Sequence, residues 1–378
     1  MATKLIKFTV QGFRNFRDPI DIDFSDVHDY AFNKECISDG IIMKMGIYGN
    51  NGEGKSNLGF ALFDIVKLLT DKNVDPAAIS PNTFLNVDGK TTEARFSYMF
   101  KRSDNVITFS YSKSAETVLT SETLAVNGTT IYSYDYLEKK FSEENLKMIN
   151  VPTLNFEYLQ SSLSILRYIA NNTVQDESSP VKAIMDFVSH MLWFRYIPNN
   201  GYIGLETSLQ NLDEWIIDNG YVKDFSNFLK SVCNLEMDIS VASIKDVSGK
   251  KDLLVEKHSN GLLLFSLVAS NGTKAAELFY FWSKRFQNVS LLFMDEFDAY
   301  FHHTMALAII KKLKEFKDMQ AIFTTHNTTL MGNEILRPDC YMILSKGKLK
   351  SFIDSANGRE IREGHNLEKI YRGGGLDG

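Results

Sequence analysis

A glycine-rich octapeptide that ends in lysine and serine is the clearest chemical feature of this sequence. The segment GNNGEGKS at 49–56 fits the pattern Gly-x-x-x-x-Gly-Lys-Ser/Thr. Glycines let the backbone curl so that N–H groups converge on phosphate oxygens, while a lysine adds positive charge and a serine hydroxyl can ligate Mg²⁺. The pattern predicts a site for ATP and Mg²⁺ built from Gly49, Asn50, Asn51, Gly52, Gly54, Lys55, Ser56 and Asn57.

The segments on either side of this loop support that interpretation. Apolar residues at 41–48 predict a buried strand before the loop. From Leu58 to Leu69, apolar residues recur at three- and four-residue steps, which indicates a helix after the loop. The start of such a helix favours anions, because its first N–H groups have no partners within the helix. Strand, loop and helix therefore follow in the order that phosphate binding needs.

Two adjacent carboxylates end a second apolar segment, LLFMDEF at 291–297. In that position Asp295 would hold the magnesium ion, and Glu296 would orient and polarise the attacking water. Two adjacent acids at the end of a buried strand repel each other unless a cation lies nearby, and the metal would remove this conflict. A pair of acids at a strand end can also be a simple helix cap. Its place downstream of a phosphate loop favours the catalytic role.

Three further polar positions follow from the order of the elements. His326 ends the apolar strand after the carboxylates, where it could sense the γ-phosphate, although a histidine there can also be structural. Asp298 could reach across a dimer interface. The turn Ser270-Asn271-Gly272-Thr273 precedes a helix pattern at 273–286. Free N–H groups at a helix start form an anion site, but a simple N-cap explains this turn equally well.

The rest of the sequence predicts an α/β protein with two additions. Period-two segments at 92–136, with a hairpin signal at Asn127-Gly128, predict an antiparallel lobe. Helical patterns dominate the range 138–235, and one of them runs through VKAIMDFVSHMLWF at 181–194. Alternating strands and helices after that range predict a parallel sheet. We therefore expect a first half of the core with the lobe at 1–137, a mainly helical insertion at 138–235, and a second half of the core at 236–378.

Composition limits the classes of function. The net charge of −6 is not the strongly basic balance of a dedicated nucleic-acid binder. The three cysteines have no metal-ligand spacing and are expected to be reduced structural thiols. No segment approaches the roughly 20 apolar residues that span a membrane, and the N-terminus has no signal-peptide pattern. We expect a soluble cytoplasmic protein without a membrane partner.

The order of these motifs resembles the head of ABC-type ATPases. Within that class, the chain resembles the stand-alone SMC-like AAA ATPases of prokaryotic abortive-infection and phage-defence systems, the AbiLi/RloA-like group. The opening KFTVQGFRNFRD at 7–18 is similar to that group's first strand and adenine-side loop. The ending HNLEKIYRGGGLDG at 365–378 is similar to its C-terminal tail. The resemblance implies a P-loop NTPase of the ABC-ATPase head type, with an antiparallel β lobe and a helical insertion.

The resemblance also implies roles for individual residues. Lys55 and Ser56 would bind phosphates and Mg²⁺, Asp295 would support the metal, Glu296 would be the catalytic base, and His326 would sense the γ-phosphate. Ser270 and Gly272 would contact the nucleotide of a second protomer, so that ATP joins two chains into a head-to-tail homodimer. A higher oligomer built from such dimers is the alternative. Arg17 would contact phosphate from the N-terminal loop. Gln160 is a weak candidate for the glutamine that approaches the metal, and an ordinary surface residue is the more common reading of such a glutamine.

Departures from the family pattern narrow the function. SNGT replaces the usual Leu-Ser-Gly-Gly type of signature, which predicts hydrolysis that is slow or dependent on a partner. The chain has neither the heptads nor the Cys-x-x-Cys of the coiled-coil SMC and zinc-hook proteins, and no acidic cluster of an appended nuclease. The leading hypothesis is an ATP-dependent switch that controls a co-encoded toxin or nuclease in antiphage defence.

Two rival functions fit less well. A RecF-like DNA-repair ATPase that clamps DNA has a similar size, and its basic surface would come from Lys311, Lys312, Lys314 and Lys317, which can also be a solvated helix face. A transporter ATPase is disfavoured by the long separation between Ser56 and Ser270.

Overall fold

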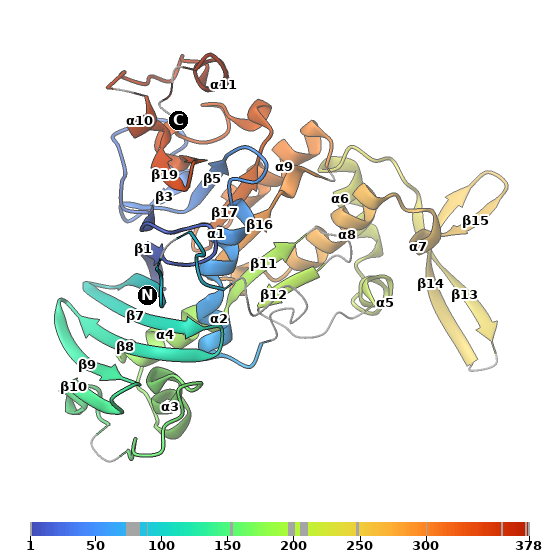
Figure 1. Cartoon of the computed structure of the whole chain (residues 1–378). Coiled ribbons are helices and arrows are strands. Elements are labelled where there is room, and N and C mark those ends of the chain that lie inside the picture. Colours follow the sequence, from blue (N-terminus) through green and yellow to red (C-terminus); the bar gives the residue numbers. More distant parts are fainter. Residues whose placement is uncertain are drawn as a thin grey trace.

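A computed structural model describes most of the chain: residues 2–72, 84–88, 90–151, 154–195, 201–204, 211–246, 249–299, 301–356, 358–374 and 376. Two seven-stranded sheets dominate these residues, and a smaller three-stranded sheet projects from them (Figure 1). No helix within the described ranges combines the length and the apolar character that crossing a bilayer requires.

The central sheet has the strand order β12-β11-β16-β17-β5-β18-β19. Its five inner strands are parallel, and an antiparallel strand closes each edge. The strands β5, β16 and β17 are buried along their whole length, as expected for a parallel sheet covered on both faces. The strands are β5 (Lys44–Tyr48), β11 (Met191–Arg195), β12 (Gly201–Gly204), β16 (Leu291–Asp295), β17 (Gln320–Thr325), β18 (Tyr341–Ser345) and β19 (Lys348–Ser351).

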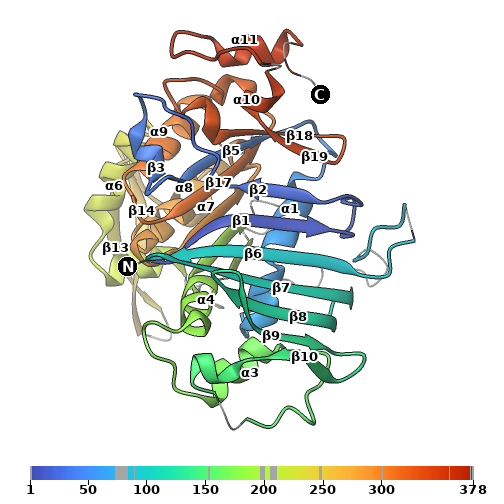
Figure 2. The ribbon, with the colours of Figure 1, turned by 90° about the vertical axis from the view of Figure 1, so that its left-hand side faces the viewer.

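The second large sheet is antiparallel throughout, in the order β10-β9-β8-β7-β6-β1-β2 (Figure 2). The hairpin between β8 and β9 turns at Asn127 and Gly128, both with positive φ, as the sequence predicts. The predicted lobe is confirmed and extended at both edges. Its strands are β1 (Lys4–Gln11), β2 (Ile20–Asp23), β6 (Ala94–Arg102), β7 (Asn105–Ala115), β8 (Val118–Val126), β9 (Thr129–Asp135) and β10 (Lys140–Glu144).

The helix after the glycine-rich loop packs between the two sheets. α1 (Lys55–Leu62) contacts both β1 and β16, and α2 (Asp64–Leu69) continues it after a break at Phe63. Gly59 allows this close packing, since a Cβ there would lie 2.8 Å from the rings of Phe293 and Trp193. A buried ion pair of 2.6 Å between Asp64 and Lys113 of β7 fixes α2 to the lobe.

The range 138–235, which we expected to be mainly helical, contributes helices and also strands of both large sheets. Four α-helices form among the described residues of that range, but β10 joins the lobe, and β11 and β12 join the central sheet. The prediction that the helix runs through Phe194 is wrong, because α4 ends at Ser189 and MLWFR forms β11. A short apolar run does not distinguish a buried strand from a buried helix, and here tertiary pairing with β16 decides. The helices are α3 (Ile165–Asn172), α4 (Pro180–Ser189), α5 (Leu212–Asp218) and α6 (Val222–Ser231).

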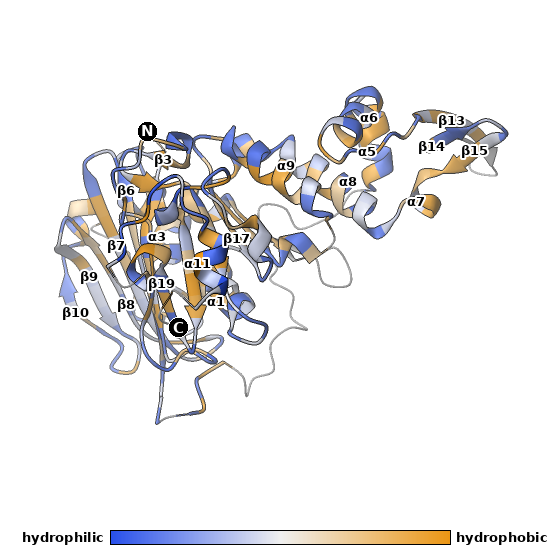
Figure 3. Cartoon of the chain, turned by 90° about the horizontal axis from the view of Figure 1, so that it is seen from above, coloured by the Kyte–Doolittle hydropathy of each residue, from blue (hydrophilic) through white to orange (hydrophobic). Residues whose placement is uncertain are grey.

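An arm extends from the helices α5, α6 and α8 (Figure 3). Its sheet contains β13 (Ile239–Asp246), β14 (Gly249–His258) and β15 (Gly261–Leu264), followed by α7 (Phe265–Val268) and α8 (Asn271–Ser283). The chain then returns to the core through β16 and α9 (His303–Lys314), and ends with α10 (Phe352–Ser355) and α11 (Leu367–Arg372). Together, the parallel sheet with its loop and the antiparallel lobe confirm the P-loop NTPase fold of the ABC-ATPase head type.

Candidate nucleotide-binding site

The glycine-rich loop and the two carboxylates lie at the same edge of the central sheet. β17 pairs in parallel with β5 on one side and with β16 on the other. The carboxyl ends of all three strands therefore meet at one edge, and β5 and β16 are separated by about 10 Å, which is two strand spacings. Lys55 follows β5, and Asp295 ends β16. The structure thus brings together the groups that the sequence places 240 positions apart in the chain.

The loop has the backbone shape that close approach to phosphate requires. Gly52 and Gly54 have φ angles of 85° and 103°, which residues other than glycine rarely adopt. A Cβ at Gly54 would lie 2.3 Å from Nδ2 of Asn15, and a Cβ at Gly49 would lie 2.6 Å from the carbonyl oxygen of Leu344. Gly52 is therefore required by conformation, Gly49 by space, and Gly54 by both.

The ammonium of Lys55 is folded back over this loop. It donates to the carbonyl oxygens of Gly49 at 2.8 Å and Asn50 at 3.0 Å. Burial lowers the pKa of Lys55, and the carboxylates of Glu296 and Asp295 act against that shift. The opposing effect of these two acids shows that Lys55 lies within their field. A bound polyphosphate would supply further negative charge to keep the ammonium protonated.

A threonine that sequence reasoning missed connects the two carboxylate positions. The hydroxyl of Thr324, on β17, donates to Oδ1 of Asp295 at 2.8 Å and accepts from the N–H of Glu296 at the same distance. Thr324 is fully buried. The only sequence signal is its position two residues before His326, because the register between β16 and β17 cannot be read from the sequence.

Glu296 has a backbone conformation that non-glycine residues rarely adopt. Its φ is 46°, in the left-handed region, just after β16 ends. Such a conformation costs on the order of 1 kcal/mol and persists where surrounding contacts hold it, as at many functional sites. Here the bond from its N–H to Thr324 is one such contact, and the Glu296 side chain is half-buried at the sheet edge.

The donor set fits a magnesium ion. Oδ2 of Asp295 and Oδ1 of Asp298 are buried, and neither has a hydrogen-bond partner among the described residues. Ser56 is the second residue of α1 and is half-buried. Although the described residues hold no cluster of three or more His, Cys, Asp or Glu side chains, Mg²⁺ normally takes only one or two protein ligands and completes its shell with water and phosphate.

The N-terminal loop touches the phosphate loop through Arg14 and Asn15. Nη1 of Arg14 donates to Oδ1 of Asn57 at 2.8 Å, and Nδ2 of Asn57 donates to Oδ1 of Asn15 at 2.7 Å. Asn15 also donates to the carbonyl oxygen of Glu53. The predicted phosphate contact, Arg17, is instead exposed and pairs with Asp18 at 3.1 Å.

The local turn explains this difference. Phe13 and Phe16 exchange two backbone hydrogen bonds and are both buried, so that Arg14 and Asn15 form the tip of the turn. Arg17 follows the turn and lines a separate small groove with Lys90 and Arg95. The signal in the sequence was the spacing of the two phenylalanines, which places the two residues between them at the tip.

His326 is exposed at the end of β17. The register pairs Thr325 with Tyr48, so His326 comes next to the start of the glycine-rich loop. A short 3₁₀ turn, η7 (Thr328–Leu330), follows it. The position that the sequence predicts for a γ-phosphate sensor is therefore beside the loop.

The other predicted contacts belong to segments outside the central sheet and the glycine-rich loop. Gln160 is exposed next to Ser161, whose carbonyl oxygen accepts from the N–H of Leu119 at the start of β8. Ser270 caps α8, since its hydroxyl accepts from the N–H of Thr273 at 3.1 Å, and Gly272 lies in the first turn of that helix. Figure 1 places this end of α8 beside α7 and the arm, on the side remote from α1.

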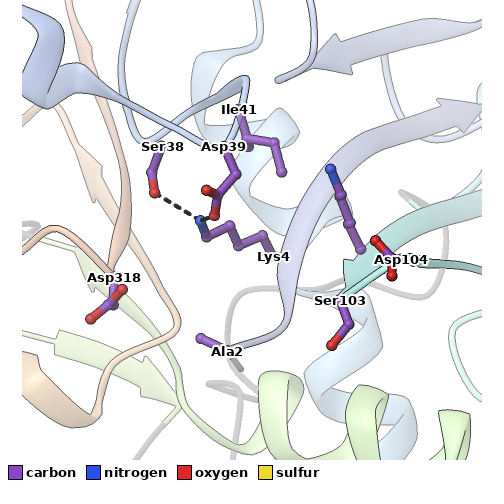
Figure 4. Close-up of a pocket in the computed structure, with 9 residues that line it drawn as sticks. Ala2, Lys4, Ser38, Asp39, Ile41, Ser103, Asp104 and Asp318 are labelled. Carbon is purple, nitrogen blue, oxygen red and sulfur yellow. Dashed lines mark hydrogen bonds and ion pairs between the residues drawn. The ribbon is translucent and has the colours of Figure 1, made fainter.

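Two other features do not compete with this site. A cavity of about 520 Å³ is lined by Lys4, Ser38, Asp39 and Asp104, among others, but Lys4 is already neutralised by Asp39 at 2.5 Å (Figure 4). On α9, Lys312 pairs with Glu315 at 2.6 Å and Lys314 with Glu35 at 3.0 Å. Their positive charge is thus offset within the chain.

Comparison with known proteins agrees with the geometry. Residues 44–332 match the sequence profile of a family described as "AAA domain, putative AbiEii toxin, Type IV TA system". A search of curated proteins found no match.

Solved structures that are similar to this chain include three SMC head domains. An SMC head bound to the C-winged helix domain of ScpA has a TM-score of 0.46 and 14% identity, and the match covers 92% of this chain and 96% of that one. An SMC head from Thermotoga maritima has a TM-score of 0.42 and 16% identity, covering 92% and 97%. A third, described with a ScpA domain derived from Pyrococcus furiosus, has a TM-score of 0.46 and 13% identity, covering 92% and 95%.

Proposed function

This chain belongs to the AAA-domain family of the AbiEii toxin type, and we propose that it binds ATP with Mg²⁺ and hydrolyses it as a head-to-tail homodimer. One observation carries the proposal. A buried lysine on a glycine-rich loop and a pair of carboxylates meet at one sheet edge, and the buried Oδ2 of Asp295 lacks a partner among the described residues. A cation with a polyphosphate satisfies all of these groups at once.

The residues at this edge have distinct roles in the proposed reaction. Lys55 exchanges the carbonyl oxygens of Gly49 and Asn50 for phosphate oxygens, while the loop N–H groups bind the remaining oxygens. Ser56 and Asp295 hold Mg²⁺, which when bound neutralises developing charge on the phosphates. Glu296 orients the attacking water and accepts its proton, and His326 binds the terminal phosphate.

The proposed dimer follows from where Ser270 and Gly272 lie. This turn is remote from the glycine-rich loop of the same chain, and Ser270 is exposed. We infer that it contacts the nucleotide of a second copy, and the free N–H groups at the start of α8 would then face the phosphates. Because these contacts would form only with nucleotide present, ATP would shift the population from monomer to dimer.

We further propose that the dimer is a switch for a co-encoded toxin or nuclease in antiphage defence. The family description, which refers to a toxin–antitoxin system, supports a partner of this kind. The short SNGT turn supports hydrolysis that is slow or dependent on that partner. Of the four lysines that would supply the basic surface of a DNA clamp, Lys312 and Lys314 are paired with acids of this chain, which disfavours that alternative.

The proposal is tested by measuring ATP hydrolysis and molecular mass together. We expect the purified chain to release phosphate from ATP only with Mg²⁺. We expect Glu296→Gln to bind ATP without turnover and to elute as a dimer in light scattering. Normal hydrolysis by Glu296→Gln would show that another residue is the base. Absence of any ATP binding by the unaltered chain would contradict the proposed function itself.

A further inference from the structure

The C-terminal helix α11 packs directly against the turn that follows the predicted γ-phosphate sensor. Oε1 of Glu368 accepts a hydrogen bond of 3.0 Å from the hydroxyl of Thr328. Thr328 is the first residue of η7 and comes two positions after His326. In this way, a residue near the end of the given sequence contacts the segment at the carboxyl edge of the central sheet.

The tail that carries Glu368 is held on this edge by half-buried hydrogen bonds and by one buried leucine. Nδ2 of Asn333 donates to the carbonyl oxygens of Arg362, Glu363 and His365, at 3.1, 2.8 and 3.0 Å. The side chain of Asn366 then caps α11 by accepting from the N–H of Lys369. Leu367 is fully buried. Glu368 therefore meets Thr328 from a rigid support.

The same helix also comes near the phosphate loop. Tyr371 is half-buried, and its pKa is raised by burial and by the carboxylate of Glu53. Glu53 lies inside the glycine-rich loop, and its Oε2 accepts from the N–H of Lys346 at 2.6 Å. One turn of α11 thus faces both the loop that would bind phosphate and the turn beside His326.

We propose that Glu368 is a positioning residue for ATP hydrolysis, which holds the His326 turn at the phosphate site through the hydroxyl of Thr328. The inference rests on the proposed function, because it assigns a residue to that reaction. Glu368 would not touch the nucleotide. Its loss would leave ATP binding at the glycine-rich loop and slow the step that needs His326 in place.

A set of matched variants tests this role. Thr328→Val removes the donor and Glu368→Ala the acceptor, whereas Thr328→Ser and Glu368→Gln retain a donor and an acceptor. Glu363→Ala is the control, since that exposed residue lies on the same tail and contributes only its carbonyl oxygen to Asn333. Turnover, ATP affinity and thermal midpoint are measured for each variant and for Thr328→Val/Glu368→Ala together.

Glu368 also pairs with Arg372 at 3.3 Å, but that contact is exposed and should contribute little. We expect the two disruptive variants to lower kcat about tenfold, as loss of one half-buried charge-assisted bond predicts, with ATP affinity within about threefold of the unaltered chain. The double variant should be no slower than either single one, because both remove the same bond. The conservative variants and Glu363→Ala should keep their turnover.

Three results would overturn the assignment: normal kcat in Glu368→Ala, additive losses in the double variant, or an equal loss in Glu363→Ala. A lower thermal midpoint without a fall in kcat would likewise show that Glu368 only stabilises the fold. If the unaltered chain has no ATPase activity at all, the proposed function fails, and this inference fails with it. The ATPase activity of the unaltered chain thus distinguishes failure of the proposed function from failure of the role assigned to Glu368.

Discussion

The hydroxyl of Thr324 serves two positions of the site at once. It donates to Asp295 and accepts from the backbone of Glu296, whose φ is positive. One buried side chain therefore sets both the direction of a metal ligand and the placement of the proposed base. The proposed chemistry therefore also depends on β17, which lies between β5, the strand before the phosphate loop, and β16, the strand that ends in the carboxylates.

We expect Thr324→Val to reduce ATP turnover by about tenfold or more, since it leaves Asp295 and the Glu296 N–H without their shared partner. Thr324→Ser keeps the hydroxyl and should remain active. Steady-state phosphate release over a range of Mg²⁺ concentrations measures both the rate and the metal requirement. Equal rates and equal Mg²⁺ dependence in the valine variant would show that Thr324 has no part in the site.

The two arginines of the N-terminal loop offer a direct comparison. Arg14 bonds to Asn57, on the helix of the phosphate loop, whereas Arg17 pairs with its neighbour Asp18. We expect Arg14→Gln to weaken ATP affinity by about tenfold and Arg17→Gln to change it by less than about twofold, because exposed ion pairs contribute little. Titration calorimetry with ATP compares the two. The reverse order would favour Arg17, and not Arg14, as the arginine that supports phosphate binding.

Among the elements, α8 and α5 each contribute one acid to a pair at their contact. Glu277 is 6% exposed on α8, and Asp213 of α5 is half-buried. Burial raises the pKa of Glu277 to about 9, and the charge of Asp213 adds to that effect. The pair therefore retains a proton at neutral pH. This matters for function because α8 begins at Ser270, the residue proposed to meet a second copy.

Stability should fall with pH because of this pair. The folded chain keeps a proton on Glu277 that the unfolded chain loses above pH 4.5, so the free energy of unfolding decreases from about pH 4.5 towards pH 9. We expect Glu277→Gln to match the unaltered chain near pH 5 and to exceed it at pH 8, by on the order of 1–2 kcal/mol. Urea unfolding at the two pH values checks this. A variant that is less stable at pH 8 would contradict it.

How far the sequence predicts these elements depends on how local their signals are. The phosphate loop, the carboxylate strand and the hairpin at Asn127-Gly128 carry signals within a few residues, and each forms where expected. β11 carries no such local signal, because the sequence MLWF fits either a helix or a strand. Only its pairing with β16 in the folded chain makes it a strand. The same holds for Thr324 and for Glu368, because their partners are distant in sequence and only the folded register brings them together.

For the whole molecule, the arm and α7 present apolar side chains next to the Ser270 turn. Leu262, Leu263 and Leu267 are 54%, 47% and 77% exposed. They lie close in sequence to Ser270, the residue proposed to contact the nucleotide of a second copy. A second copy seated on that turn would cover this surface, which gives the proposed dimer an apolar contact beside its polar one.

We expect Leu267→Glu to weaken the ATP-dependent dimer while leaving ATP affinity of the monomer unchanged, since Leu267 is outside the phosphate loop. Burying a charge at such a contact would raise the dimer dissociation constant by about tenfold or more. Val174→Glu is the control, at a fully exposed position on another part of the chain. Sedimentation with ATP in the Glu296→Gln background compares them. An unchanged dimer in Leu267→Glu would place the interface elsewhere.

The central claim is that Lys55 and Asp295 serve one metal–nucleotide complex, and manganese in place of magnesium tests it most directly. Electron paramagnetic resonance can count Mn²⁺ bound to the chain with and without ATP. We predict ATP-dependent binding of Mn²⁺ to the unaltered chain, loss of the metal but not of all ATP in Asp295→Asn, and loss of both in Lys55→Ala. Tight ATP-dependent binding of Mn²⁺ by Asp295→Asn would show that the carboxylate and the phosphate loop do not share an ion.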